Sequence, residues 1–273
     1  MNIRKIGFFV VLLLAAMLFV SGCAEETGEE MGEEMEDAEG VIEGELEEAG
    51  EEMGEELEYT EDEIGEYSPV INPDAFIEII DNPYFPLIPG TTFVYEGESE
   101  DGLIRNEIFV TSETRLVMGV TTIVVRDREL EDDELVEETY DWYAQDKDGN
   151  VWYFGEDSKE YEDNKVVSTA GSWEAGVDGA LPGILVKGNP RVGEIYRQEY
   201  REGVAEDMAE VISLDESVTV VYGSFDNCLK TREWNPLEPG QGENKYYAQG
   251  IGLLLEMEIG GDEQLELIEI TTK

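Results

Sequence analysis

Histidine is absent from this 273-residue chain, and basic residues are scarce. Without histidine there is no Ser-His-Asp or Cys-His nucleophile pair, no His-ligated zinc and no histidine general base. The phosphate loop GxxxxGK[ST] and the nucleophile elbow GxSxG are missing too. The sequence therefore predicts a protein that is not an enzyme, although a hydrolase that works with carboxylates alone remains an alternative.

The charge is strongly one-sided, with 17 Lys and Arg against 67 Asp and Glu and a net charge of −50. From Ala24 to Ser68 there are 22 acidic residues and no basic one, and from Pro69 onward 45 acidic residues face 15 basic ones. Such a surface repels nucleic acid and anionic lipid headgroups and attracts cations. We therefore expect no nucleic-acid partner and a loose association with cations.

Cysteine is scarce as well, with two residues in the chain, and the first lies at a marked change of composition. The basic start Met1–Lys5 leads into the apolar run Ile6–Val20, and the string VSGC closes it at Cys23. A run of this length behind a basic start is typical of a secretory signal peptide. VSGC also resembles the lipobox of prokaryotic lipoproteins, in which the cysteine receives fatty chains such as palmitate.

We therefore predict a lipoprotein signal peptide over residues 1–22 and lipidation of Cys23. The alternative is an uncleaved N-terminal anchor in which Cys23 has no role. Both alternatives export the chain and hold it on the outer face of a membrane, in the cell envelope. In that compartment cysteines tend to be paired or absent, so Cys228 is expected to be a small buried apolar residue.

Residues 23–68 form an acidic tether in this interpretation. GEEM begins at positions 28, 32 and 50 and GEEL at 54, and the apolar positions repeat every 11 residues, which is close to a straight helix. Glycines and like charges without basic partners oppose a stable helix. The sequence predicts a disordered or weakly helical segment that holds the rest of the chain away from the membrane.

Residues 69–273 have the composition of short strands separated by turn residues. A short helix is expected from Asn72 through Ile80, and beyond it no helical stripe of three turns is present. The expected strands cover residues 91–98, 104–114, 121–130, 135–146, 150–157, 159–169, 194–203, 207–223, 227–236, 245–249, 253–261 and 263–272. The predicted fold class is all-β: a single antiparallel, strongly curved sheet or incomplete barrel.

Four strings in this region carry a family resemblance: DNPYFPLIPGTTFVYEG, DWYAQDKDGNVWYFGE, GSWEAGVDGALPGI and YYAQGIGLLLE. With them, the chain from about Ile71 to about Leu267 resembles a family of bacterial and archaeal secreted proteins and lipoproteins. Phe93 departs from the pattern, because tryptophan is frequent there. The resemblance implies a single β domain and a lipoprotein, and it carries over no catalytic residue.

The string TYDWYAQDKDGNVWYFGED (139–157) is the first candidate binding region. A two-residue turn at Asp148-Gly149 would make a hairpin in which Tyr143 faces Phe154 and Asp141 faces Glu156. Aromatic side chains then lie on both faces, so either other parts of the domain cover them or one face lines a cleft for an apolar or carbohydrate ligand. The candidate ligand-binding residues are Trp142, Tyr143, Trp152, Tyr153, Phe154 and Trp173.

Trp173 belongs to the loop 170–184, which is expected either to close over that cleft as a lid or to place its tryptophan in the core. In the hairpin turn, Asp146, Asp148 and Asn150 alternate as at the start of a calcium loop, so a weak Ca²⁺ site is an alternative to plain turn chemistry. No other cofactor is expected. Arg197, Arg201, Arg232 and Lys245 are expected to be local ion-pair partners.

These observations favour a lipid-anchored extracytoplasmic protein whose β domain binds an apolar or carbohydrate ligand or a protein partner. The alternative is a structural or stress-related surface protein without a discrete ligand, whose acidity serves solubility and hydration.

Overall fold

The computed structural model describes residues 67–99, 102–261 and 263–273 of the chain. The predicted signal peptide, Cys23 and nearly all of the predicted tether lie outside the described residues. Within these residues no helix is long and apolar enough to cross a membrane. The regular secondary structure of the described part is all strand, apart from one 3₁₀ turn at Pro73–Ala75.

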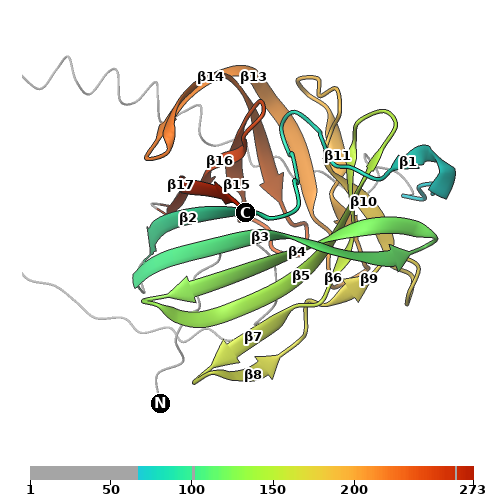
Figure 1. The fold of residues 1–273 in the computed structure, drawn as a ribbon, viewed down its shortest axis with the longest axis horizontal. Helices are drawn as coiled ribbons and strands as arrows, with labels where there is room; N and C mark the ends of the chain where they lie inside the picture. Colours follow the sequence, from blue (N-terminus) through green and yellow to red (C-terminus); the bar gives the residue numbers. More distant parts are fainter. Residues whose placement is uncertain (1–66, 100–101, 262) are drawn as a thin grey trace, which may run out of the picture. The chain divides into compact units, whose positions relative to one another are not determined.

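One antiparallel sheet curves almost into a closed barrel, which confirms the predicted fold class (Figure 1). Its first half is a meander of β2 (Thr91–Ser99), β3 (Gly102–Val117), β4 (Val120–Glu131), β5 (Glu134–Asp146) and β6 (Val151–Glu156). Its second half is a meander of β13 (Met208–Val220), β14 (Gly223–Trp234), β15 (Glu243–Ala248), β16 (Gly252–Glu258) and β17 (Gln264–Thr272).

The two meanders meet along both sides. On one side β17 pairs with β2, from Gln264 opposite Glu98 to Thr272 opposite Thr91. On the other side short strands connect β6 with β13: β10 (Leu181–Val186) pairs with β6 and with β12 (Glu199–Tyr200), and β11 (Ile195–Arg197) pairs with β13. Short strands β1 (Phe76–Ile77), β7 (Lys159–Glu162), β8 (Lys165–Ser168) and β9 (Trp173–Glu174) extend the edges.

Tight turns explain why the long strands pair with their neighbours. Met118-Gly119 and Asp132-Asp133 both have positive φ angles and connect β3 to β4 and β4 to β5. Two-residue hairpin loops need such angles, because the twist of that turn then matches the twist of the strands.

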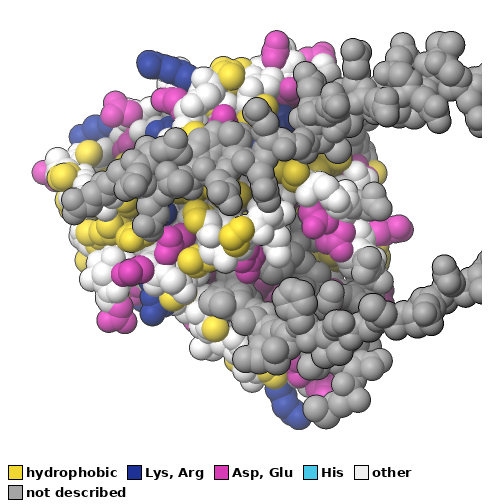
Figure 2. All heavy atoms as spheres, turned by 180° about the vertical axis from the view of Figure 1, so that it is seen from behind, with side chains coloured by type: hydrophobic (Ala, Val, Ile, Leu, Met, Phe, Trp, Pro, Cys, Tyr) yellow, Lys and Arg dark blue, Asp and Glu magenta, His cyan; other side chains and the backbone are white. Residues whose placement is uncertain are grey.

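The interior combines an apolar core with polar side chains. The core contains the buried residues of β2, β3, β4, β16 and β17, such as Phe93, Ile104, Val125, Leu254 and Leu267. Cys228 is fully buried in the same cluster, as predicted. Acidic side chains are scattered over the face shown in Figure 2, but several others are buried inside the sheet.

Three expectations about local structure are wrong. The helix through Ile80 is a single 3₁₀ turn, because Phe76 and Ile77 pair with β5 instead. The hairpin loop after Asp146 contains three residues, since Asp146 N donates to Asn150 O at 3.0 Å and Gly149 alone adopts a positive φ.

That longer loop places Tyr143 opposite Tyr153 rather than Phe154. The register shifts again before Asp141, which lies opposite Glu156 as predicted.

The third error is the loop 170–184, which contains β9 and most of β10. Gly183 lets β10 approach its neighbour closely, because a Cβ there would lie 2.2 Å from the carbonyl carbon of Gln198. The strand that links β6 to the second meander therefore has Pro182 and Gly183 in its middle, which are unusual strand residues.

Candidate functional site

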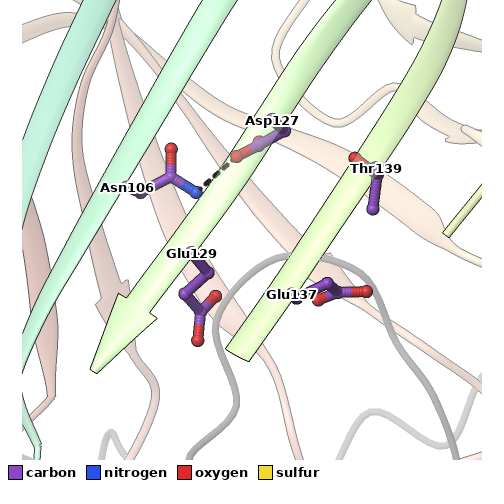
Figure 3. Close-up of a pocket in the computed structure, with 5 residues that line it drawn as sticks. All are labelled: Asn106, Asp127, Glu129, Glu137 and Thr139. Atoms are coloured by element: carbon purple, nitrogen blue, oxygen red, sulfur yellow. Dashed lines mark hydrogen bonds between the residues drawn. The ribbon is translucent and has the colours of Figure 1, made fainter. Parts of the chain in front are cut away.

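A small pocket opens between β3, β4 and β5, and we call it the carboxylate pocket (Figure 3). Its lining residues are Asn106, Asp127, Glu129, Glu137 and Thr139. Strand alternation brings them together. Successive side chains of a strand point to opposite faces of the sheet. On β4 the apolar core residues Ile123 and Val125 point inward, and Asp127 and Glu129 continue this alternation, so the two acids also point to the inner face.

Backbone register sets the neighbours inside the pocket. Glu129 pairs with Glu137 of β5 and with Asn106 of β3, and Asp127 pairs with Thr139. Asn106 Nδ2 donates to Asp127 Oδ1 at 2.8 Å, and Thr139 Oγ1 donates to Asp141 Oδ2 at 3.2 Å. Three carboxyl groups therefore face one small space.

Glu129 is the unusual member of the pocket. Its residue is 5% exposed, yet its carboxyl group has no hydrogen bond or ion pair with any described residue. Burial, and then the negative charges of Glu137 and Asp127, hold its pKa well above the usual range. A carboxylate with so little exposure and no partner among the described residues is costly, so a proton, a cation or a water donor in the pocket would stabilise Glu129.

The other two acids of the pocket, Asp127 and Glu137, also have raised pKa values. Burial raises the pKa of Glu137 to about 7, although the Ser158 hydroxyl donates to it at 2.7 Å. Burial, and then Asp141, hold the pKa of Asp127 well above normal, against the hydrogen bond from Asn106. Asn106 Oδ1 is itself buried and has no hydrogen-bond partner among the described residues. The pocket is thus rich in acceptors and poor in donors.

More carboxyl groups continue along the interior from the pocket. Asp141 accepts from Tyr153 Oη at 2.8 Å, and burial raises its pKa to about 7. Glu156 lies opposite Asp141, and burial and then Asp141 hold its pKa well above the usual range. Burial also raises the pKa of Glu199 to about 8.

A second interior cluster, the lysine cluster, consists of Lys245 with Glu233, Glu243 and Glu256. The Lys245 ammonium lies 3.3 Å from Glu233 Oε2, 2.8 Å from Glu243 Oε1 and 3.5 Å from Glu256 Oε2. Burial alone would lower the pKa of Lys245, but Glu243, Glu256 and Glu233 hold it well above normal. Lys245 is therefore an ion-pair partner, as expected, but its side chain is only 12% exposed.

The aromatic candidates from the sequence lie together but inside the protein. Phe76 of β1 packs edge-on against Trp152 and Phe154, with ring centroids 6.2 and 5.5 Å away. Arg115 lies over Trp142, 4.0 Å from the ring centroid. Neighbouring segments thus cover this side of the hairpin.

On the other side Tyr143 and Tyr153 stack with centroids 4.9 Å apart. Trp173 packs edge-on against Tyr153 at 5.3 Å and is 4% exposed. Trp173 therefore lies in the core, where the alternative to a lid would place it. A ligand on these aromatic residues stays a prediction.

The calcium candidates form a tight turn. Asp146 Oδ1 accepts from the backbone N–H of Asp148 and Asn150, and Oδ2 accepts from Asn150 Nδ2 and Trp152 Nε1 at 2.8 Å. Both oxygens of the Asp146 carboxylate thus accept hydrogen bonds from donors in the turn and the hairpin. Among the described residues no group of three Asp, Glu, Cys or His side chains is arranged to hold a metal ion.

Four strings with family resemblance meet at this end of the sheet. Gln145 Oε1 accepts from the N–H groups of Asp81 and Asn82, both at 2.8 Å. Gln249 Nε2 donates to Tyr84 Oη at 3.0 Å, and Trp173 lies against Tyr153 as described. The strings therefore contact one another in the fold, although the family assignment itself stays a prediction.

No protein-family model matches this chain, and no curated protein does. Among solved structures, the chain is similar to a "putative lipoprotein" from Parabacteroides distasonis. The similarity has a TM-score of 0.34 and 15% sequence identity, and it covers 70% of this chain and 99% of the other. Similarity at this level is too low to support an argument about fold or function.

Proposed function

We propose that this protein is an exported lipoprotein whose β domain binds a small, positively charged ligand in the carboxylate pocket. The export and the anchor rest on the basic start, the apolar run and the VSGC string at Cys23. Two fatty chains hold a protein firmly on a membrane where one chain would not. The acidic residues that follow keep the domain on the outer face and away from the lipid headgroups.

One observation carries the ligand part of the proposal: Glu129 is 5% exposed, lines the pocket, and makes no hydrogen bond or ion pair with a described residue. The aromatic hairpin offers a weaker case for its expected apolar or carbohydrate ligand, because Phe76, Phe85 and Trp173 already pack against its rings. A protein partner could present the same positive charge. We propose no reaction, and the expectation that the protein is not an enzyme stays a prediction.

The anchor can be tested by replacing Cys23 with serine in the full chain. We expect the wild-type protein to partition into the membrane fraction, with a leader removed and a mass that includes lipid. The Cys23→Ser variant should retain its leader or appear in the soluble fraction. A Cys23→Ser protein that stays on the membrane after its leader is removed would overturn the lipoprotein proposal.

The pocket can be tested with a panel of organic cations, divalent metals and neutral sugars, by measuring the melting temperature of the full chain in detergent. We expect at least one cation to raise the melting temperature of the wild type and of Glu113→Gln, which removes an exposed charge on β3. The same cation should have much less effect on Glu129→Gln. A panel without any effect, or an effect that survives in Glu129→Gln, would contradict binding in this pocket.

The structural alternative keeps one supporting observation, the net charge of −50, which favours solubility and hydration by itself. It predicts that every cation of one valence acts alike, whichever variant is used. The panel separates this behaviour from that of a defined pocket.

A further inference from the structure

We infer that the carboxylate pocket binds a primary ammonium group, so that the ligand is a small organic amine. The inference rests on the proposed function, and it names the chemical class of the ligand. Four features of the described residues carry it: the acceptors of the pocket wall, its size, the lack of metal-binding geometry, and a comparable cluster elsewhere in the interior.

The wall of the pocket offers mainly acceptors. The Asn106 amide and the Thr139 hydroxyl already donate to Asp127 and Asp141. Glu129 lacks any described partner, and Asn106 Oδ1 has none either. An ammonium group has three donors and no acceptor, whereas a hydroxyl group needs donors as well as acceptors from its surroundings. The chemistry of the wall therefore fits an ammonium group better than a sugar hydroxyl.

The free space in the pocket is small, about 10 Å³. A single water molecule needs roughly 10–15 Å³ measured in the same way. The compact head of a primary amine is of this size, whereas a planar guanidinium group with its fork of donors is wider. The pocket is not fully enclosed, so the rest of an amine can extend outward from it.

A bare metal ion fits less well. Calcium needs six to eight oxygen ligands, and magnesium needs near-ideal octahedral geometry. Asp127, Glu129 and Glu137 do not form a group that could hold a metal ion, and neither does any other set of described residues. An ammonium group needs only three acceptors and no fixed coordination geometry.

In the lysine cluster the same interior places the ammonium of Lys245 within 3.5 Å of three carboxyl groups. Glu243 and Lys245 are two residues apart on β15, with Glu233 and Glu256 on the adjacent strands. In the carboxylate pocket Asp127 and Glu129 are two residues apart on β4, with Asn106 and Glu137 on the adjacent strands. The two clusters share this arrangement, and the pocket lacks an ammonium of its own.

Protons compete with the amine for the pocket. The charged groups that most raise the pKa values of Asp127, Glu129 and Glu137 are all acidic. They lie on β4, β5, β7 and just before β17, and they are Asp127, Glu129, Glu131, Glu137, Asp141, Glu160 and Glu263. An ammonium group binds the ionised carboxylates, so binding should release protons and strengthen as the pH rises.

The test uses the full chain in detergent at 150 mM salt, with binding measured by isothermal titration calorimetry at pH 5.5 and pH 8. Methylammonium is the principal probe, and tetramethylammonium is the matched control because it carries the same charge without an N–H donor. Guanidinium, Ca²⁺ and glucose test the competing ligand classes. Ethanolamine carries the primary ammonium group of a lipid headgroup, and N-acetyl-lysine amide carries that of a peptide side chain.

We expect methylammonium to bind at least tenfold more tightly at pH 8 than at pH 5.5, with no detectable binding of tetramethylammonium. Glu129→Gln should lower the methylammonium affinity at least tenfold, and Glu113→Gln should leave it unchanged. A melting curve of Glu129→Gln shows whether that variant is folded. If it is not, Glu137→Gln provides the same test.

The outcomes separate the inference from the proposed function. Binding of guanidinium or Ca²⁺ without methylammonium, lost in Glu129→Gln, would overturn the ammonium inference and leave the proposed function intact. Equal binding of methylammonium and tetramethylammonium would also overturn it. If no cation binds, both fail. Tighter binding of ethanolamine or N-acetyl-lysine amide than of methylammonium would support the ammonium inference and identify a lipid headgroup or a lysine side chain as the source of the amine.

Discussion

The lysine cluster and the carboxylate pocket lie in the same sheet and contain similar acids, but they have opposite electrostatics. In the first, Lys245 contacts three glutamates, and it lowers the pKa of Glu243 against the effect of burial. In the second, the charged groups that act on Glu129 are all acidic, and its pKa is raised by burial and by them. Burial still matters beside the cation, because the fully buried Glu256 keeps a pKa well above normal although Lys245 lies 3.5 Å away, whereas the less buried Glu243 has a lowered pKa.

The largest effect should come from Lys245→Met, which would turn the lysine cluster into a second cluster without a cation. Removing one partner of a buried ion pair costs about 3–5 kcal/mol, because the remaining charges are left uncompensated. We expect a loss of this size at pH 8 by urea denaturation, and a smaller loss at pH 5, where the glutamates can take up protons. Lys165→Met, at an exposed position of β8, is the control. A loss no greater than that of the control would show that the two clusters do not differ.

The stability of the fold should depend on pH through the buried acids near the pocket. Asp141 and Glu199 are buried, with pKa values raised to about 7 and about 8, so the folded state holds protons that the unfolded state releases above about pH 4. Stability is therefore greatest at low pH and falls as the pH rises through these values.

We expect the free energy of unfolding to fall by several kcal/mol between pH 5 and pH 8, because each of the two groups loses about 1.4 kcal/mol per pH unit until its folded pKa is reached. Urea midpoints at intervals of one pH unit measure this. Glu156→Gln, which replaces one of the buried acids, should make the curve flatter. A midpoint that rises over this range would mean that the interior acids are ionised and stabilised, as Glu243 is.

Asp146 provides a third comparison, because its carboxylate has four donors and no buried acid beside it in the turn. Asp146→Ala leaves these donors without an acceptor and should destabilise the fold by about 1–3 kcal/mol. We expect the same fall in melting temperature with Ca²⁺ and with EDTA. A loss seen only with Ca²⁺ would support the metal site predicted for Asp146, Asp148 and Asn150.

The smallest effect should be a gain. Glu129→Gln keeps the shape of the side chain and removes the charge, so we expect about 1 kcal/mol of stabilisation at pH 8 and almost none at pH 5. Chemical denaturation of both proteins at the two pH values measures it. Lower stability of the variant at pH 8 would indicate that Glu129 already has a favourable partner.

Much of the fold could be predicted from the sequence, because alternation and turn residues are local signals. The runs 91–98 and 121–130 correspond to β2 and β4 with small shifts at their ends. β10 could not be found in this way, because Pro182 and Gly183 resemble a loop and the strand forms through pairing with distant segments. The hairpin turn at Gly149 was predicted with one residue too few, because Asp146 accepts the donors of the turn.

Part of the carboxylate pocket could have been predicted from the alternation of residues along one strand, although the number of acidic residues alone gives no indication of it. Asp127 and Glu129 alternate in step with Ile123 and Val125, so an inward direction follows from their parity on β4. Their proximity to Glu137 depends on register, and the absence of a partner for Glu129 depends on strands far away in the chain. The surroundings of Lys245 could not be predicted for the same reason, because its three glutamate partners lie on three different strands.

The pairing of β17 with β2 has a consequence for biogenesis. The first long strand finds its partner about 170 residues later, in Gln264–Thr272, and the apolar residues Leu265 and Leu267 arrive with it. The sheet therefore cannot close between these two strands until that segment has been synthesised.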